Sequence, residues 1–340
     1  MPSLPHPFRR LSFWGCLGLA LLLAGCHAFP QNTLDPSTDF GWQTHKLFTD
    51  ILWWEVGIFV LVEGALVLAL LRFTRKRKGA GEPEQVHGNT GIEVAWTLAP
   101  ALILVFIGVP TVMTIFRTQA PPPKDSLKIE VIGHQWWWEF RYPEYGIVTA
   151  NEVHVQRGRP VHFEMTSADI IHSFWIPRLG GKRDVIPTRT NHLWMTPEKL
   201  GVIPGQCAEF CGTSHANMRL HAVVNTPVDF AAWVRAEQDT LPPPKDDSLA
   251  VQGAALFVNP AKLCTTCHTI NGVSNGVVGP NLTHVGSRRY IAAGLLANTP
   301  DNLAKWISNP PGVKPGALMP VVGVTPDEAR ALAAYLTSRK

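Results

Sequence analysis

Three long runs of apolar residues occupy the first third of the chain. They are Leu11 to Ala24, Ile51 to Leu71 and Val94 to Phe116. The second and third runs match the roughly 20 residues that a helix needs to cross a bilayer. The first run is shorter and follows Arg9 and Arg10, an arrangement typical of a secretory signal. The pattern therefore predicts a signal peptide over residues 1–25 and a hairpin of two transmembrane helices within residues 51–119.

The flanks of these runs predict the side of the membrane that each part occupies. The first run ends in Leu23-Ala24-Gly25-Cys26, which resembles the cleavage site of bacterial lipoproteins, where the cysteine carries the lipid. An ordinary signal cleaved nearby is the alternative. Basic residues from Arg72 to Lys78 indicate a cytoplasmic loop, because positive residues collect on that side. We therefore expect a bacterial inner-membrane protein with a possible lipid anchor at Cys26, whose residues 26–50 and residues after 119 lie on the periplasmic or outer face.

Short segments beyond the hairpin alternate between polar and apolar residues. They are Lys128 to Ile132, Val153 to Gln156 and Val161 to Met165. Because Gly, Pro and Asn separate them, they are typical of strands in a sandwich or small barrel. We therefore expect a β domain over residues 120–241.

The last part of the chain has apolar residues at helical spacing. The segments are Ala250 to Phe257, Leu303 to Ile307 and Asp327 to Leu336. Proline-rich stretches at Pro121–Pro123 and Pro242–Pro244 are typical of semi-rigid spacers. They separate the hairpin from the β domain, and the β domain from a helical domain over residues 242–340.

Composition narrows the class of protein. Only 16% of the 340 residues are charged and 46% are hydrophobic, which excludes a disordered or fibrous chain. The net charge of +4 comes without a basic stripe interleaved with aromatic residues. We therefore expect no nucleic-acid partner.

One pair of cysteines lies in Cys264-Thr-Thr-Cys267-His268, the attachment signature of c-type haem. Both thiols would join the haem covalently, and His268 would bind its iron. Met319 is the candidate for the second axial ligand, because Met/His ligation suits electron transfer. His284 is the other candidate ligand, but we expect it to be an ordinary surface histidine. A redox or zinc-binding cysteine pair is the alternative to haem.

A second group of ligand residues lies within twelve positions, from Cys207 to Met218. It contains Cys207, Cys211, His215 and Met218. Thiolate, thioether and imidazole ligands together favour copper. Two cysteines exceed what one blue-copper ion needs, so the set indicates two copper ions bridged by both thiolates, with a further histidine from elsewhere in the chain.

These residues resemble a known family. The run Cys-Ala-Glu-Phe-Cys-Gly-Thr-Ser-His-Ala-Asn-Met is similar to the dinuclear copper (CuA) loop of cytochrome c oxidase subunit II. His172-Ser-Phe-Trp-Ile-Pro177 and Gly133-His-Gln-Trp-Trp-Trp138 match two further motifs of that family. The resemblance covers roughly residues 45–230. With the haem signature, the chain resembles subunit II of caa-type oxidases.

The resemblance implies a fold and a ligand set. The fold is a membrane α-helical hairpin, an all-β cupredoxin-like (Greek-key) domain and an all-α class I cytochrome c domain. The CuA ligands would be the side chains of His172, Cys207, Cys211, His215 and Met218 and the backbone carbonyl of Glu209. The Glu209 carboxylate would also bind magnesium at the contact with subunit I.

Two further residues acquire roles from the resemblance. Trp136 matches the tryptophan at which electrons enter, and at least one of the three consecutive tryptophans must face outward, because side chains alternate along a strand. Trp137 stands where the family usually has tyrosine. Glu93 matches the glutamate at the entrance of the oxidase's K proton channel.

The resemblance implies the electron-entry subunit of a respiratory haem-copper oxidase. Electrons from an external donor, such as a cytochrome c or a quinol–cytochrome c reductase complex, would pass through haem c and CuA to subunit I, which reduces oxygen. Subunit III is a further expected partner. Residues 120–244 sum to a net charge of −1 and residues 245–340 to +4. Tethering of the haem domain would therefore replace much of the charge steering of a soluble donor.

Two other functions are compatible with parts of this pattern. The copper and haem motifs also suit the electron-entry subunit of a copper-containing nitric oxide reductase, although Glu93 and Glu209 favour the oxidase. A copper-delivery protein would share the two cysteines and a remote histidine, but it would lack His215 and Met218. A quinol-oxidase homologue would have lost the copper ligands, all of which are present here.

Overall fold

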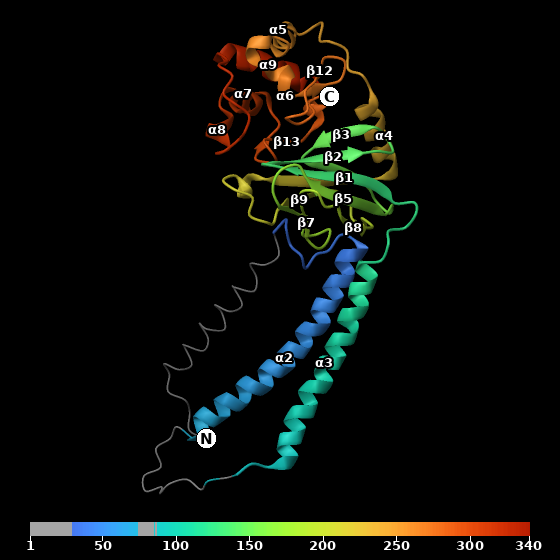
Figure 1. Ribbon diagram of the computed structural model, residues 1–340, viewed down its shortest axis with the longest axis vertical. Coiled ribbons are helices and arrows are strands. Elements are labelled where there is room, and N and C mark those ends of the chain that lie inside the picture. The colour runs from blue at the N-terminus through green and yellow to red at the C-terminus, as the bar shows by residue number, and fades with distance from the viewer. Residues whose placement is uncertain (1–28, 74–84, 86) are drawn as a thin grey trace, which may run out of the picture.

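The computed structural model describes residues 29–73, 85 and 87–340. The predicted signal peptide, the predicted lipid site at Cys26 and most of the basic loop lie outside these described residues. Two long helices extend from one side of a β-rich body, and a mainly helical C-terminal domain lies on the opposite side (Figure 1). The chain therefore has three structural layers along its longest axis.

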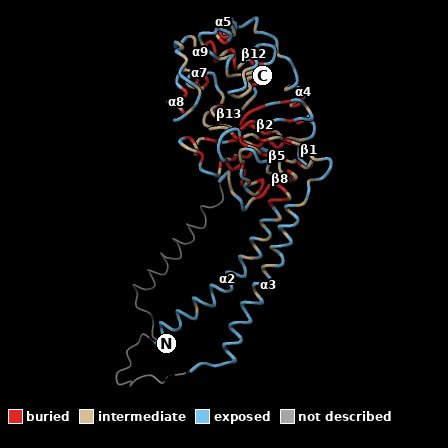
Figure 2. Tube along the Cα trace, in the orientation of Figure 1, coloured by how far each residue is buried: buried red, intermediate tan, exposed pale blue. Residues whose placement is uncertain are grey.

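The two helices form the predicted hairpin. They are α2 (Asp39–Phe73) and α3 (Thr90–Thr118), and both are long and apolar enough to cross a membrane. Their residues are mostly exposed (Figure 2), as expected for surfaces that face lipid. Trp54 of α2 stacks on Phe106 of α3, with ring centroids 6.0 Å apart. Both predicted spans fall inside these helices, so the prediction of a two-pass membrane protein is supported.

The β-rich body contains two sheets of five strands. The first has the order β3-β2-β1-β5-β8, with β1 (Leu127–His134), β2 (Trp137–Tyr142), β3 (Ile147–Ala150), β5 (Val161–Ser167) and β8 (Asn191–Met195). The second has the order β4-β10-β9-β6-β7, with β4 (Glu152–Gln156), β6 (His172–Trp175), β7 (Arg183–Val185), β9 (Gly201–Cys207) and β10 (Arg219–Asn225). Helix α4 (Pro227–Gln238) follows β10.

The core of this β domain lies between the two sheets. Residues of β1 alternate between buried and half-buried, which aims one face of the strand inward. Phe140 of the first sheet packs edge-on against Phe174 of the second, with centroids 6.3 Å apart. The first turn of α2 is fixed to the same domain, because the Phe40 ring packs on Gly180 and Gly181.

The C-terminal domain is helical, as predicted. Its helices are α5 (Ser248–Phe257), α6 (Cys264–Cys267), α7 (Pro300–Ser308), α8 (Pro310–Val313) and α9 (Pro326–Thr337). Short pairs β11 (Thr269–Ile270) with β12 (Ser274–Asn275) and β13 (Tyr290–Ile291) with β14 (Leu296–Ala297) join them, as do the 3-10 turns η3 (Pro260–Lys262) and η4 (Val285–Ser287). Helices α5 and α9 pack closely, because a Cβ atom at Gly253 would lie only 1.9 Å from the Ala331 carbonyl oxygen.

The C-terminal domain contacts the β domain at two places. At the first, the Glu152 carboxylate is buried and accepts hydrogen bonds from the backbone N–H groups of Arg289 and Tyr290, at 2.7 and 2.9 Å. The Tyr290 ring stacks on His221 of β10, with centroids 4.1 Å apart. Charge-assisted bonds of this kind are among the stronger ones in proteins. This contact joins the β13 segment to the second sheet.

The second contact lies over Trp136. The buried Lys314 ammonium donates a hydrogen bond to the Trp136 carbonyl oxygen, and the Ser214 hydroxyl donates one to the Pro315 carbonyl oxygen. Gly316 has a φ of +83°, and a Cβ atom added there would lie 3.0 Å from the Trp136 ring. A glycine is therefore needed both for the backbone conformation and for the close approach.

The linker between the two domains is also held in place. Arg339, near the C-terminus, is 2% exposed, and its guanidinium donates hydrogen bonds to the carbonyl oxygens of Leu241 and Pro242, both at 3.2 Å. These carbonyl groups belong to the predicted proline-rich spacer. The C-terminal domain therefore binds its own linker.

Candidate metal and haem centres

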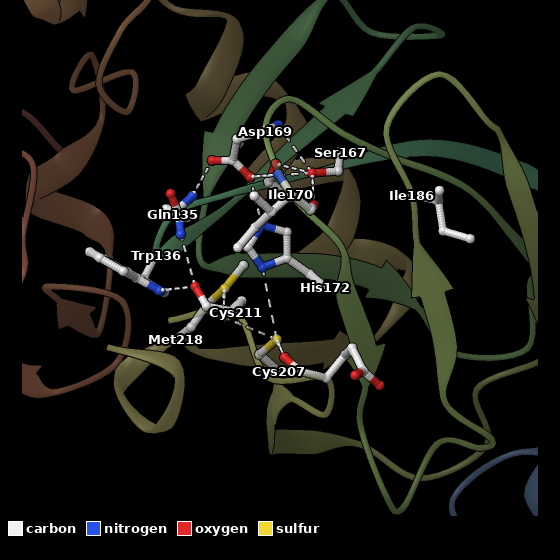
Figure 3. A network of polar contacts seen from close by, with 12 residues as sticks. Gln135, Trp136, Ser167, Asp169, Ile170, His172, Ile186, Cys207, Cys211 and Met218 are labelled. Atoms are coloured by element: carbon white, nitrogen blue, oxygen red, sulfur yellow. Dashed lines mark hydrogen bonds and ion pairs between the residues drawn. The ribbon is translucent and has the colours of Figure 1, made fainter. Parts of the chain in front are cut away.

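Two neighbouring strands and one loop bring the predicted copper ligands together (Figure 3). Cys207 ends β9, and Phe174 of β6 pairs with it, so that His172 at the start of β6 lies close by. The chain then turns back through the 3-10 turn η2 (His215–Asn217) into β10, which pairs with β9. This return places Cys211, His215 and Met218 beside Cys207. His172 is therefore the second histidine that two copper ions would need.

The distances between the ligand atoms fit bound metal ions. The Cys207 and Cys211 sulfur atoms are 3.8 Å apart, and both thiols are free. Two thiolates with metal–sulfur bonds of about 2.3 Å at a tetrahedral angle lie about 3.8 Å apart. The distance from Cys211 Sγ to His215 Nδ1 is 3.6 Å and that from Cys207 Sγ to His172 Nδ1 is 3.9 Å. A sulfur–nitrogen ligand pair is expected at about 3.6 Å.

The remaining predicted copper ligands lie at the same place. Met218 Sδ is 3.9 Å from Cys211 Sγ, and the Glu209 carbonyl oxygen is 3.2 Å from Cys207 Sγ. Both cysteines and Met218 are buried, whereas the Glu209 residue is exposed. The donor set thus contains two thiolates, two imidazoles, one thioether and one carbonyl, with the sulfur atoms and His172 buried and His215 half-buried, and it fits two copper ions.

The pKa values of the two thiols favour binding of a cation. The hydrogen bond between them lowers the pKa of Cys207 to about 3 and raises the pKa of Cys211 well above its usual range. A second negative charge beside the first is unfavourable without a positive partner. A bound metal cation would favour full deprotonation of the pair.

The sequence pattern did not identify Asp169, which positions His172. The Asp169 carboxylate lies 2.8 Å from His172 Nε2, the nitrogen that points away from the sulfur atoms. Burial raises the pKa of Asp169, but the hydrogen bonds with His172 and with the backbone N–H groups of Gln135 and Ile170 together lower that pKa to about 2. Carboxylates that bond to the second nitrogen of a metal-binding histidine fix its orientation and raise its basicity. Its spacing, three residues before His172, is the one signal that could have indicated it.

Trp136 lies between the copper cluster and the C-terminal domain. Its indole N–H donates a 2.7 Å hydrogen bond to the Cys211 carbonyl oxygen, and the Gln135 amide donates one to the same oxygen at 2.9 Å. Trp136 is only 8% exposed, because the Lys314–Gly316 segment covers it. The expected outward-facing tryptophan therefore faces the C-terminal domain instead of water. Trp138 is fully buried, and Trp137 is half-buried and stacks on His134.

The haem signature lies in α6 and the residue after it. Cys264 and Cys267 are free thiols in the four-residue helix. The His268 ring is held by its Nδ1 atom, 2.9 Å from the Pro280 carbonyl oxygen, which leaves Nε2 for iron. A Cβ atom at Gly279 would lie 2.6 Å from the same ring. These residues fit a covalently attached haem. Met319 is half-buried and follows the segment that covers Trp136.

His284 is not the surface residue that we expected. It is 4% exposed and precedes η4, where the Gly286 N–H donates to the Arg339 carbonyl oxygen at 2.6 Å. The C-terminal residues cover it, and burial lowers its pKa. The prediction failed because it used the polarity of histidine alone and could not include the return of the chain end.

Glu93 lies far from both centres. It is exposed in the first turn of α3, one turn beyond the Asn89 cap, at the end of the hairpin opposite the β domain (Figure 1). Its backbone N–H donates to the Asn89 carbonyl oxygen at 2.9 Å.

Three family models match consecutive parts of the chain. They are the transmembrane domain of cytochrome c oxidase subunit II over residues 31–114, its periplasmic domain over residues 146–226, and cytochrome c over residues 250–340. The crystal structure of the periplasmic domain of cytochrome oxidase subunit II from Bradyrhizobium japonicum is 33% identical, with a TM-score of 0.33. It covers 34% of this chain and 96% of its own.

Similar proteins extend over nearly the whole chain. Cytochrome c oxidase subunit 2 of Alkalihalophilus pseudofirmus is 35% identical, over 99% of this chain and 96% of its own length. The Bacillus subtilis protein of the same name is 31% identical, over 94% of this chain and 95% of its own length. A quinol oxidase subunit 2 from B. subtilis is 30% identical over 66% of this chain. The predicted three-part fold class is therefore confirmed, and the chain belongs to the cytochrome c oxidase subunit II family, in the form that carries a C-terminal cytochrome c domain.

Proposed function

We propose that this oxidase subunit receives electrons in its cytochrome c domain (residues 242–340) and delivers them through its β domain (residues 120–241) to subunit I. When bound, haem c and the two copper ions supply the one-electron chemistry. Cys264, Cys267, His268 and Met319 would hold the haem. His172, Cys207, Cys211, His215, Met218 and the Glu209 carbonyl oxygen would hold the copper.

The contact over Trp136 is the observation that carries this proposal. The Lys314–Gly316 segment of the cytochrome c domain lies against the Trp136 ring, and the indole N–H bonds directly to the backbone of Cys211. A continuous series of contacts thus joins the segment before Met319 to a copper ligand. The buried ring also keeps water out of this junction.

The protein's residues hold the copper ligands in one arrangement. The Asp169 carboxylate orients His172, and the strand pairing fixes both Cys207 and the start of β10. Ligands that do not move when the charge changes require little reorganisation. This property suits a site that only transfers electrons.

Several further roles remain proposals that rest on the family. The exposed Glu209 carboxylate would bind magnesium with subunit I, and Glu93 would admit protons to the K channel. Subunit III and a cytochrome c or quinol–cytochrome c reductase complex are the proposed partners. Periplasmic placement, a cleaved signal and lipidation at Cys26 are proposed from the sequence alone.

Substitution of Trp136 tests the electron path. Trp136→Phe removes the indole N–H and part of the ring that contacts Gly316, so we expect a several-fold slower reduction of copper after the haem is reduced. Trp137→Phe is the matched control, because Trp137 stacks on His134 instead. Rapid-mixing absorption of both centres measures the two rates. Equal rates in wild type and Trp136→Phe would exclude this path.

A spectrum separates the oxidase from the nitric oxide reductase alternative. The complex that co-purifies in mild detergent is reduced and examined with and without carbon monoxide. An a-type haem together with a c-type band and oxygen uptake would support the proposal. Haem b and c without haem a, together with nitric oxide consumption, would support the reductase.

A further inference from the structure

A second group of metal-ligand residues lies on the outer face of the first sheet, away from the copper cluster. We call His162, Glu164 and His192 the β5–β8 cluster. His162 and Glu164 lie two positions apart on β5, so their side chains share one face. His192 of β8 pairs directly with Glu164. Two strands therefore present three ligand side chains at one place.

The geometry of the two imidazoles suits a metal ion. His162 Nε2 and His192 Nδ1 are 3.1 Å apart, and the rings are 5.2 Å apart between centroids. Two nitrogen ligands with bonds of about 2.0–2.1 Å lie about 2.9 Å apart at a right angle and about 3.3 Å apart at a tetrahedral angle. The observed separation lies between these values. Both nitrogen lone pairs can therefore reach one ion with small side-chain shifts.

The carboxylate supplies the third ligand. One ligand atom from each of Glu164, His162 and His192 lies within 4.8 Å of the other two, and one of the two Glu164 oxygens forms a 2.8 Å ion pair with Lys128. Lys128 thus fixes the Glu164 carboxylate and leaves the other carboxylate oxygen available to bind a metal ion. Such outer partners orient metal ligands, although the lysine charge also weakens cation binding.

Few places in the described part of the chain bring three such ligand residues together. Among the described residues, two groups place three or more His, Cys, Asp or Glu ligand atoms within 4.8 Å of one another, and the other group is the copper cluster. The β5–β8 cluster is accessible, because His192 is exposed and the other two residues are half-buried. An ion can therefore enter from solvent.

We propose that the β5–β8 cluster binds one divalent transition-metal ion of the zinc class, separate from CuA. Two imidazoles and one carboxylate are a ligand set that zinc prefers, with water completing the tetrahedron. Magnesium and calcium prefer oxygen ligands, and copper(I) prefers sulfur. The ligand set therefore disfavours magnesium, calcium and copper(I) relative to zinc.

The position of the cluster indicates what the ion would do. Strand β8 is the edge of its sheet, and residues in and just after it bond to the start of α2 and to the chain just beyond α3. The Trp194 indole N–H donates to the Ala120 carbonyl oxygen just beyond α3, and the Thr196 N–H donates to Asp39 at the start of α2, both at 2.6 Å. An ion that joins β5 to β8 would therefore stabilise the junction between the β domain and the membrane hairpin.

A zinc titration of the detergent-purified complex, with copper and haem in place, tests this proposal. Zinc is partitioned between the protein and a chromophoric chelator. We expect one more zinc equivalent in wild type than in His192→Ala, and weaker binding in Glu164→Gln. His87→Ala is the matched control, because His87 is an exposed histidine outside the cluster. Unchanged copper and haem spectra establish that each variant is folded.

Two further readouts distinguish the outcomes. Cobalt(II) at the site should give visible absorption bands that His192→Ala lacks, and zinc should raise the unfolding temperature of wild type but not of His192→Ala. Equal zinc binding by wild type and His192→Ala would overturn the proposal. A loss of the extra zinc equivalent in His87→Ala would also overturn it, because the metal would then be adventitious. Neither outcome bears on the electron path through Trp136.

Discussion

Individual residues around the copper cluster show what spacing can and cannot predict. Cys207, Cys211, His215 and Met218 are close in sequence, so the loop alone indicates their common site. Asp169 acts through a single hydrogen bond to His172 and leaves no pattern of its own. Lys314 contacts Trp136 across 178 positions of sequence, a contact that no local rule describes.

Substitution of Asp169 should loosen the copper. Asp169→Asn removes the negative charge that orients His172, and loss of such an outer partner weakens metal binding by about 10–100-fold. Competition with a copper chelator measures this. Asp184→Asn is the control, because Asp184 is exposed on β7 and hydrogen-bonds through its backbone. Equal copper retention in both variants would show that Asp169 has no positioning role.

Glu237 should make stability depend on pH. Burial raises its pKa to about 7, against the opposing effects of Arg288 and Trp233. The folded state then binds more protons than the unfolded state between about pH 4.5 and 7. The Glu237 carboxyl therefore does not lower the free energy of unfolding below about pH 4.5. As the pH rises to about 7 and above, its ionisation lowers the free energy of unfolding by at most about 3 kcal/mol.

The pH effect is measured as a difference between two proteins. Glu237→Gln should unfold at a higher temperature than wild type at pH 8 and at the same temperature at pH 4. Subtracting the unfolding temperature of wild type from that of Glu237→Gln at each pH removes the contribution of all other titrating groups. If the two unfolding curves differ by a constant amount across this range, Glu237 titrates normally in the folded protein.

At the scale of elements, burial on one face decides which strands and helices the sequence predicts. The alternation in β1 and β5 is regular because each has one face in the core, and α5, α7 and α9 show helical spacing for the same reason. Strand β9 contains Pro204, which normally argues against a strand. Its pairing with β10 opposite His221 overrides this local signal.

Two glycines in one domain test the close approach to Trp136. Gly316 and Gly323 both have positive φ, so alanine strains the backbone at each, but only at Gly316 would the new Cβ atom meet the Trp136 ring. Gly316→Ala should slow copper reduction several-fold, whereas Gly323→Ala should not. Similar rates in the two variants would mean that this contact does not govern transfer.

The whole molecule fixes the cytochrome c domain by contacts far apart in sequence. Glu152 holds the β13 segment, Lys314 holds the segment before Met319, and Arg339 holds the linker. The sequence predicts the three domains from their periodicity and spacers. It could not predict how they dock, because each contact joins residues from different domains.

Removal of the Glu152 acceptor should release this docking. Glu152→Ala leaves the N–H groups of Arg289 and Tyr290 without an acceptor, and a buried unsatisfied group costs about 1–3 kcal/mol. We expect faster proteolysis between residues 239 and 247 and slower copper reduction. Glu198→Ala, an exposed glutamate, is the control. Wild-type proteolysis in Glu152→Ala would exclude a docking role.

The cover over Trp136 has a kinetic consequence. A soluble donor must first collide with its acceptor, so its rate rises with concentration and falls with ionic strength when opposite charges guide it. Here the Trp136 ring is already in contact with the cytochrome c domain, the proposed donor. On the proposed path, transfer to copper would be a first-order event, and salt should change only the earlier step in which the cytochrome c domain is reduced.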